Sequence, residues 1–465
     1  MSPHAVDTSH AAPITDSLLQ KRFDVSCNGF VPATVPLDRL PNDYYEPWER
    51  IIHNLARLLQ DRTIRSMIDA LEVLTIDRLE SELERRRAYT ILAMLTQAYQ
   101  WGGDIPAEVL PPAIAKPFLD ISNKMNMPPV MTYAASNLWN FSSTSSDFSD
   151  LDSIRSTHTF TGIEDESWFF MISVAMETRA ARAVPVMLRA MEAAKQKDYE
   201  LVTQALEDLQ RCIQEVGSVL DRMHERCNPD VFFNQIRPFL AGSKNMAAAG
   251  LPRGVFYDQG DGKGQWIQLR GGSNGQSSLI QFWDVVLEVQ HETEGAVNPH
   301  TPDVSRPSTP GSSSTSSERK GKQQSFFEEV RGYMPEPHRR LLQHVEQNTT
   351  IRKFALSCST SSASEVERQL RTQYDATIKT LTDFRSLHIG IVTRYIVLPS
   401  KKAAASNEKL RNLATASAGS EGKEDELVGS GGSRLLPFLK QARDETARTA
   451  KGWGSAAGHV ARARI

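Results

Sequence analysis

The side chain best suited to chemistry in this sequence is one histidine near the end of a long amphipathic pattern. Apolar and aromatic residues recur mostly every three or four positions between Leu370 and Tyr395, which predicts a helix, and Arg385 and His388 stand on its inward stripe. A histidine on an apolar face is most often a core residue whose ring nitrogens bond to backbone or to a neighbour. The alternative is a metal or cofactor ligand, because neutral imidazole is the commonest metal-binding side chain.

The common metal-binding patterns of paired histidines or cysteines do not occur in the sequence. No two of the eleven histidines lie three or four residues apart, the four cysteines form no C-x-x-C, and H-E-x-x-H is not found. Haem needs only one protein ligand, because the porphyrin supplies four. Haem is therefore the metal cofactor that a lone histidine least excludes.

Further segments carry polar groups where a ligand could bind. The turn RGGSNGQSS (270–278) is neither a P-loop nor a G-x-G-x-x-G, so it supports a nucleotide site only weakly, but its free N–H groups would favour an anion. A tight loop with capping serines is the alternative.

In NPDVFFNQIRPFLAG (228–242), Arg237 either extends to solvent or binds a carboxylate. Phe169 and Ser173 lie four residues apart on another predicted helix, where core packing is the default interpretation.

Composition limits the class of protein. The chain has 465 residues, of which 40% are hydrophobic, enough for two or three domains with their own cores. A formal net charge of −3 gives no electrostatic basis for binding nucleic acid. The N-terminus lacks an apolar signal segment, no stretch has the apolar length of a membrane span, and the scattered cysteines suit a reducing compartment. We expect a cytoplasmic protein without membrane or nucleic-acid partners.

Helical periodicity dominates the chain and predicts an all-α fold with one minor β-hairpin around GDGKG (260–264). Polar stretches rich in Ser, Pro, Gly and Asp separate the helical segments and cannot bury enough apolar area to order themselves. The expected division is a disordered extension (1–22), a small helical domain (23–141), a linker (142–160), a larger helical domain (161–400) with a disordered insertion at about 293–323, a flexible loop (401–433), and a C-terminal helix and tail (434–465).

Several short motifs, in one order along the chain, resemble indoleamine 2,3-dioxygenase. The resemblance covers about residues 25–400 together with GSGGSRLLPFLKQAR (429–443), and the long Ser/Pro insertion is similar to fungal members. The motifs are GF (29–30), LTID (74–77), AYQWG (98–102), MPPVMTYA (127–134), NPDVFF followed by Arg237, GGSNGQSS (271–278), YMPEPHRRLL (333–342) and FRSLHIGIVTRYIVLP (384–399).

The resemblance implies an enzyme that uses haem b to add both atoms of O₂ across the indole C2–C3 bond of L-tryptophan. The product would be N-formylkynurenine, in the first step of the kynurenine pathway towards NAD. Such an enzyme needs an electron donor that keeps the iron ferrous, and we expect it to be monomeric. The alternative is a haem protein that binds or senses O₂ on the same scaffold. Arg237 separates the two, because an O₂ carrier has no need of a carboxylate-binding cation.

The resemblance also implies roles for single residues, none of them as general acid or base. His388 would be the proximal ligand of the haem iron, Arg385 would lie near a haem propionate, and Asp284 would be the partner of that arginine. Arg237 would bind the substrate carboxylate with its planar guanidinium. The other implied contacts are Phe169 and Phe232 in the distal pocket with Phe233 behind them, Tyr133 and Ser173 beside the indole, Gly272 and Ser273 against the haem edge and substrate, and Ser430 in a mobile loop.

Two positions of the implied pocket depart from the mammalian members of the family. Asn274 stands where they carry alanine, and Ser136 stands where they carry cysteine. Both border the substrate in the resemblance. The sequence therefore leaves open the affinity for L-tryptophan and the acceptance of D-tryptophan or other indoles.

Overall fold

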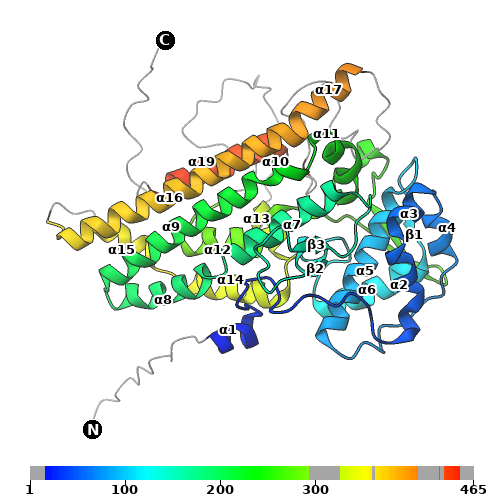
Figure 1. Cartoon of the computed structure of the whole chain (residues 1–465), viewed down its shortest axis with the longest axis horizontal. Helices are drawn as coiled ribbons and strands as arrows, with labels where there is room; N and C mark the ends of the chain where they lie inside the picture. The colour runs from blue at the N-terminus through cyan, green and yellow to red at the C-terminus, as the bar shows by residue number, and fades with distance from the viewer. Residues whose placement is uncertain (1–15, 293–324, 359–361, 407–428, 430–433, 451–465) are drawn as a thin grey trace, which may run out of the picture.

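The chain folds into a mainly helical body, as its periodicity predicts (Figure 1). The computed structural model describes residues 16–292, 325–358, 362–406, 429 and 434–450. The α-helices are α1 (Asp16–Phe23), α2 (Glu46–His53), α3 (Leu55–Gln60), α4 (Ile64–Asp69), α5 (Glu82–Trp101), α6 (Pro112–Met125), α7 (Glu164–Arg179), α8 (Ala183–Lys195), α9 (Tyr199–Asp221), α10 (Met223–Arg226), α11 (Pro229–Val231), α12 (Ser278–Val286), α13 (Phe326–Arg331), α14 (Glu336–Asn348), α15 (Ile351–Ser357), α16 (Glu365–Val392), α17 (Leu398–Ser406) and α19 (Leu435–Thr449). The strands are β1 (Val109–Leu110), β2 (Phe141–Ser143), β3 (Ile154–Ser156), β4 (Val255–Gly260) and β5 (Lys263–Ile267).

Helices α2 to α6 gather at one end of the molecule, on the right of Figure 1. The centre of this group is α5, which begins where the side chain of Ser81 accepts a hydrogen bond from the N–H of Glu84. Fifteen of its 20 residues are buried, so neighbours must cover it on most sides. Helices α2, α4 and α6 pack against it and provide this cover.

The longest helices, α9 and α16, run side by side through the rest of the molecule, and α19 packs along α16 (Figure 1). Helix α16 begins with a capping box, in which the side chains of Ser364 and Glu367 each accept a hydrogen bond from the other's backbone N–H. The predicted amphipathic helix is confirmed, because its apolar stripe is buried: Leu370, Tyr374, Ile378 and Leu381.

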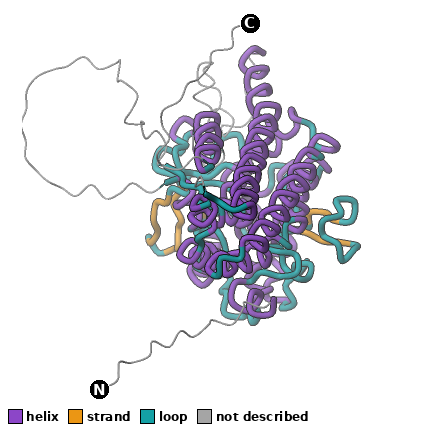
Figure 2. Tube along the Cα trace, turned by 90° about the vertical axis from the view of Figure 1, so that its left-hand side faces the viewer, coloured by secondary structure: helices purple, strands orange, loops and turns teal. Residues whose placement is uncertain are grey.

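Two small β-structures lie at the edges of the helical body (Figure 2). The hairpin expected at GDGKG is confirmed, since β4 and β5 pair antiparallel, and β1 adds parallel to β4. Its turn requires Gly260 and Gly262, which both adopt left-handed backbone, with φ of 83° and 73°. A second hairpin, formed by β2 and β3 at the start of the expected linker, was not predicted.

Two expectations of disorder are partly wrong. Residues 16–22, expected to belong to a disordered extension, form most of α1, because Leu19 and Phe23 lie one turn apart and are both buried next to α14. Residues 401–406, expected to begin a flexible loop, continue α17. The rest of the extension, the insertion, residues 407–428 and 430–433 of the expected loop, and the tail after residue 450 lie outside the described residues.

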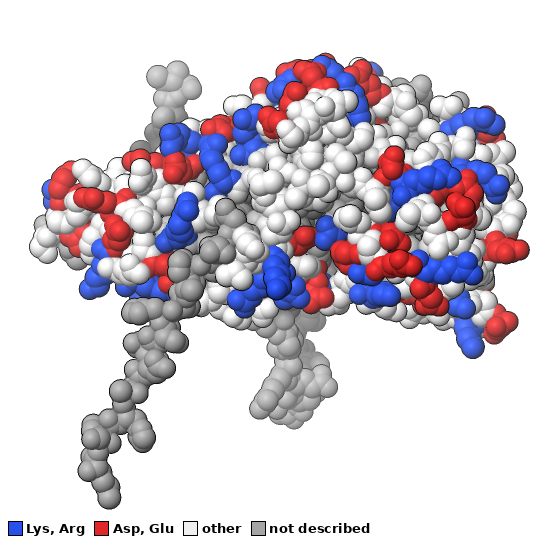
Figure 3. Space-filling model, turned by 60° about the horizontal axis from the view of Figure 1, so that its bottom comes forward, with Lys and Arg blue, Asp and Glu red and all other residues white. Residues whose placement is uncertain are grey.

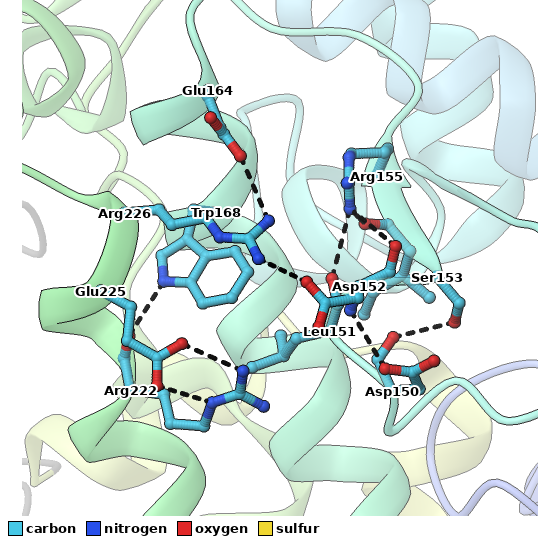
Figure 4. A network of polar contacts seen from close by, with 11 residues as sticks. Asp150, Leu151, Asp152, Ser153, Arg155, Glu164, Trp168, Arg222, Glu225 and Arg226 are labelled. Atoms are coloured by element: carbon cyan, nitrogen blue, oxygen red, sulfur yellow. Dashed lines mark hydrogen bonds and ion pairs between the residues drawn. The ribbon is translucent and has the colours of Figure 1, made fainter.

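A network of polar contacts holds the segment that contains β2 and β3 (Figure 4). Arg226 of α10 pairs with Asp152 and, at 3.3 Å, with Glu164, and its guanidinium carbon lies 4.5 Å from the ring centre of Trp168. The indole N–H of Trp168 donates to the backbone carbonyl of Arg222, at 3.0 Å. The segment is thus fixed to α7 and α10. The division of the chain into two domains stays a prediction.

A buried ion pair links α2 and α5 to the chain that leads into α7. The side chains of Glu49 and Arg87 are each 1% exposed, and the guanidinium donates two hydrogen bonds to the carboxylate, at 2.6 and 3.1 Å. Arg87 also donates to Nε2 of His158, at 2.8 Å. Burial and the adjacent Arg87 lower the pKa of His158 to about 2, so its ring is neutral and can accept this bond.

Charges of both signs are interspersed on the molecular face shown in Figure 3, and this face has no continuous basic area. The distribution agrees with the small formal net charge of −3. Among the helices that the structure describes, none combines the length and apolar composition required to cross a membrane.

We predict that Glu49→Ala destabilises the protein by about 3–5 kcal/mol, because it leaves the Arg87 guanidinium in the interior without its carboxylate. Glu215→Ala is the control. Its partner Arg182 has a side chain 47% exposed, so this substitution should cost less than about 1 kcal/mol. Urea unfolding followed by circular dichroism measures both changes, and equal losses would contradict a structural role for the buried pair.

Candidate functional site

A large cavity lies within the larger group of helices. Its walls come from α7, the ends of α9 and α16, α10, α19 and the glycine-rich turn 271–278. Three π-helical segments also contribute: η2 (Ala134–Leu138), η3 (Phe232–Ile236) and η7 (Thr393–Val397). A π-turn holds one residue more than an α-turn and is frequent at functional sites. The extra residue changes which side chains reach the cavity wall.

Most of the residues singled out in the sequence meet at this cavity. Asp284 and Arg385 do not line it but contact each other, as the resemblance implies. Ser430 lies outside the described residues, although its neighbour Gly429 lines the cavity. The roles of all these residues stay predictions. Those that line the wall are Tyr133, Phe169, Ser173, Phe232, Arg237, Gly272, Ser273 and His388, together with the two departures Ser136 and Asn274.

His388 lines the cavity from α16, and its side chain makes no hydrogen bond or ion pair with the described residues. His338 is an ordinary core histidine and serves as a comparison. It is 1% exposed, and its Nδ1 lies 3.0 Å from Oγ of Ser278. Burial and the nearby Arg385 lower the pKa of His388 to about 4, so its ring is neutral at pH 7. A neutral imidazole at an apolar cavity has the chemistry of a metal ligand.

One turn before His388 on α16, Arg385 enters a buried network of charges. Arg385 donates to Oδ1 of Asp284 at 2.5 Å, while the ring of His291 lies 3.1 Å from Oδ2 of Asp284 and 2.7 Å from Oε2 of Glu445. Burial alone would raise the pKa of Asp284, but Arg385 and His291 hold it at about 2. Burial opposes protonation of His291, but Asp284 and Glu445 raise its pKa above the ordinary value. Both ring nitrogens face carboxylates, so the network balances two cations with two anions across α12, α16 and α19.

Arg237 brings a cation to the cavity wall. It begins the short helix η4 (Arg237–Leu240) directly after η3, is only 5% exposed, and its guanidinium carbon lies 5.5 Å from the ring centre of Phe233. Burial lowers the pKa of Arg237 to about 10, which leaves it charged at pH 7. A buried guanidinium at an apolar cavity suits a carboxylate ligand, which it can bind through two parallel hydrogen bonds.

Aromatic rings form one wall of the cavity. The ring centres of Phe169 on α7 and Phe232 on η3 lie 4.8 Å apart, and Phe232 meets Tyr395 of η7 edge-on at 5.7 Å. The hydroxyl of Tyr395 donates to the backbone carbonyl of Cys227 at 2.8 Å, which fixes this ring. The wall offers apolar aromatic surface to a flat ligand.

A buried carboxyl group holds Tyr133 next to the glycine-rich turn. The hydroxyl of Tyr133 donates to Oε1 of Glu177 at 3.0 Å, and Oγ of Ser277 donates to the same oxygen at 2.7 Å. Burial raises the pKa of Glu177 to about 7, against the lowering effect of these two bonds. Glu177 was not predicted, although it follows Phe169 and Ser173 in four-residue steps on one face of α7.

Close backbone approach shapes the glycine-rich turn. A Cβ on Gly271 would lie 2.0 Å from the carbonyl oxygen of Leu240, and a Cβ on Gly242 would lie 2.3 Å from the nitrogen of Gly271. Neither position tolerates a side chain without movement of backbone. The turn presents Ser273 to the cavity, and its Oγ is buried without a hydrogen-bond partner among the described residues.

The C-terminal helix supplies a part of the wall that the sequence did not predict. Leu435, Phe438 and Leu439 of α19 line the cavity, and so does Phe326 of α13, whose ring centre lies 4.6 Å from that of Phe438. The amphipathic pattern of RLLPFLKQAR indicates an apolar face. No local signal indicates which surface that face covers, because its partners lie far away in the sequence.

Comparison with known proteins gives one family for nearly the whole chain. A family model described as indoleamine 2,3-dioxygenase matches residues 19–449. The chain is 37% identical over 433 residues to indoleamine 2,3-dioxygenase nanC of Aspergillus nanangensis, covering 91% of this chain and 95% of that protein. It is 37% identical over 443 residues to an indoleamine 2,3-dioxygenase of Saccharomyces cerevisiae, covering 91% of each. It is 33% identical over 420 residues to 6-hydroxytryptophan 2,3-dioxygenase fscD of Fusarium equiseti, covering 90% of this chain and 94% of that protein.

Fold, cavity and relatives agree on a dioxygenase that acts on an indole with O₂. The chain belongs to the indoleamine 2,3-dioxygenase family. This family depends on haem iron, so the chain is a haem-dependent oxidoreductase, and the resemblance seen in the sequence is confirmed.

We predict that Glu177→Gln changes how stability depends on pH. The folded protein holds this carboxyl at a pKa of about 7, above its ordinary 4.5, so between these values the folded state binds more protons than the unfolded state. Stability from this group therefore falls as pH rises through the range. The melting temperature of the variant, relative to wild type, should increase between about pH 5 and pH 8.

Glu192→Gln serves as the control for Glu177→Gln, because the Glu192 side chain is 58% exposed. Its melting temperature relative to wild type should stay level with pH. A level difference for Glu177→Gln as well would show that this carboxyl does not titrate as the buried site implies.

Proposed function

We propose that this protein uses haem and O₂ to cleave the indole C2–C3 bond of L-tryptophan, giving N-formylkynurenine. The observation that carries the proposal is the buried cation of Arg237 at the same apolar cavity as the lone imidazole of His388. Tryptophan has the complementary groups: a carboxylate for the guanidinium, and a flat indole for the rings of Phe169 and Phe232. Family membership supplies the class of reaction.

The residues at the cavity fit a haem group. His388 would hold the iron, since its ring is neutral, lines the cavity and has no other hydrogen-bond partner among the described residues. Arg385, supported by Asp284, would pair with a propionate. When bound, haem supplies the activation of O₂ that side chains cannot provide.

The chain's own residues bind, orient and exclude water. Arg237 would fix the substrate carboxylate, and the rings of Phe169 and Phe232 would hold the indole plane, so that the reacting bond has one orientation. Phe438 and Leu439 of α19 add apolar cover that keeps water from this region. No side chain is assigned as general acid or base, and Ser173 would position the indole.

A haem protein that only binds or senses O₂ is the second candidate. Arg237 argues against it, because an O₂ carrier has no need of a carboxylate-binding cation at the cavity wall. The proposal also includes an electron donor that keeps the iron ferrous, and it takes the protein to be a monomer.

Arg237→Ala should raise KM for L-tryptophan about thirtyfold or more, because losing one partner of a desolvated charge pair costs about 2–5 kcal/mol. The Soret absorption of bound haem should persist. Tryptamine lacks the carboxylate and is the matched probe, so its binding should change little. Steady-state kinetics and spectral titration measure both ligands, and an unchanged KM for tryptophan would overturn the carboxylate assignment.

His388→Ala should remove most bound haem or leave it inactive, with an altered ferrous–CO spectrum. His338→Ala is the control, since this histidine is buried in the interior and its Nδ1 contacts Ser278. Its loss should cost about 1–3 kcal/mol of stability and leave the haem spectrum unchanged. The assignment of His388 fails if its alanine variant keeps normal activity and an unaltered spectrum.

A further inference from the structure

Asn137 is a buried amide in the cavity wall whose oxygen is unsatisfied. It lies on η2, lines the cavity and is 4% exposed. Its Nδ2 donates to the backbone carbonyl oxygen of Tyr133 at 3.1 Å, and this contact decides which end of the amide carries the oxygen. Its Oδ1 is buried without a hydrogen-bond partner among the described residues. A buried acceptor without a partner is unfavourable, and at the wall of a cavity a bound ligand can supply the missing donor.

The hydroxyl groups beside Asn137 already have acceptors. Oγ of Ser136 lies 3.2 Å from the carbonyl oxygen of Thr132 and 3.3 Å from that of Tyr133, and the hydroxyl of Tyr133 donates to Glu177. Their hydrogens are therefore committed within the wall. Of these polar groups on η2, the one still able to bind a ligand is an acceptor, the Oδ1 of Asn137. A ligand would bind it through a hydrogen-bond donor.

The geometry points to Asn137 as a specificity-determining residue that accepts a hydrogen bond from a hydroxyl or amino group on the benzo ring of the substrate. The inference rests on the proposed function, because binding of the substrate carboxylate by Arg237 would direct the ring towards α7 and η2. An unsubstituted ring leaves Oδ1 of Asn137 without a hydrogen bond, whereas a donor group on the ring supplies that bond. The favoured substrates are then ring-hydroxylated tryptophans, with tryptophan itself also accepted.

The test compares tryptophans that carry either a hydroxyl or a fluorine at the same ring position, since both groups are small and only the hydroxyl donates. At one ring position or more, wild-type kcat/KM for the hydroxyl compound should exceed that for the fluoro compound by about tenfold. Asn137→Val should remove this preference. Ser136→Ala should keep it, because the Ser136 hydroxyl is bonded to backbone.

The inference is overturned if no ring position favours hydroxyl over fluorine, a result that needs only the wild-type protein and so does not depend on whether the variant folds. It is also overturned if Asn137→Val lowers kcat/KM equally for tryptophan and its hydroxyl derivatives, as it would if the amide served the indole N–H. Turnover of tryptophan without hydroxyl preference removes this inference alone. Absence of turnover and of any spectral response to all these compounds removes the proposed function and the inference together.

Discussion

Charge balance in the interior is the constraint on which the arrangement of the site depends. Asp284 and Glu445 are buried anions, and Arg385 and His291 are the cations that match them. Because one unmatched charge in such a place costs several kcal/mol, α12, α16 and α19 must come together as a set. Their approach fixes the part of α16 that carries His388 and brings the apolar residues of α19 over the cavity.

The helical fold and most cavity residues could be predicted from the sequence, because apolar periodicity marks the helices and short motifs mark the site. The three π-helical segments could not, since one extra residue in a turn leaves no clear mark in periodicity. The position of α19 could not either, because it depends on contacts with α13 and α16. Leu19 and Phe23 could have revealed α1, but the polar composition around them suggested disorder.

Hydrogen-bond satisfaction separates residues that look alike in the sequence. His338 and His388 both lie on helices, yet one ring nitrogen of His338, Nδ1, contacts Ser278, whereas the ring of His388 has no hydrogen-bond partner among the described residues. Ser136 and Asn137 are adjacent polar residues on η2, yet the serine bonds to backbone, whereas the amide oxygen of Asn137 is left over. Which polar group is available to a ligand is a property of three-dimensional pairing, so residue type alone does not reveal it.

The residues that line the cavity come from segments between Tyr133 and Leu439. The cavity can therefore form in the cell only after this whole stretch has been synthesised. Protein chains fold progressively as they leave the ribosome, from the N-terminus onward. A nascent chain that still lacks α19 has neither the last wall of the cavity nor Glu445 opposite His291. Haem would therefore be captured only after α19 has been translated.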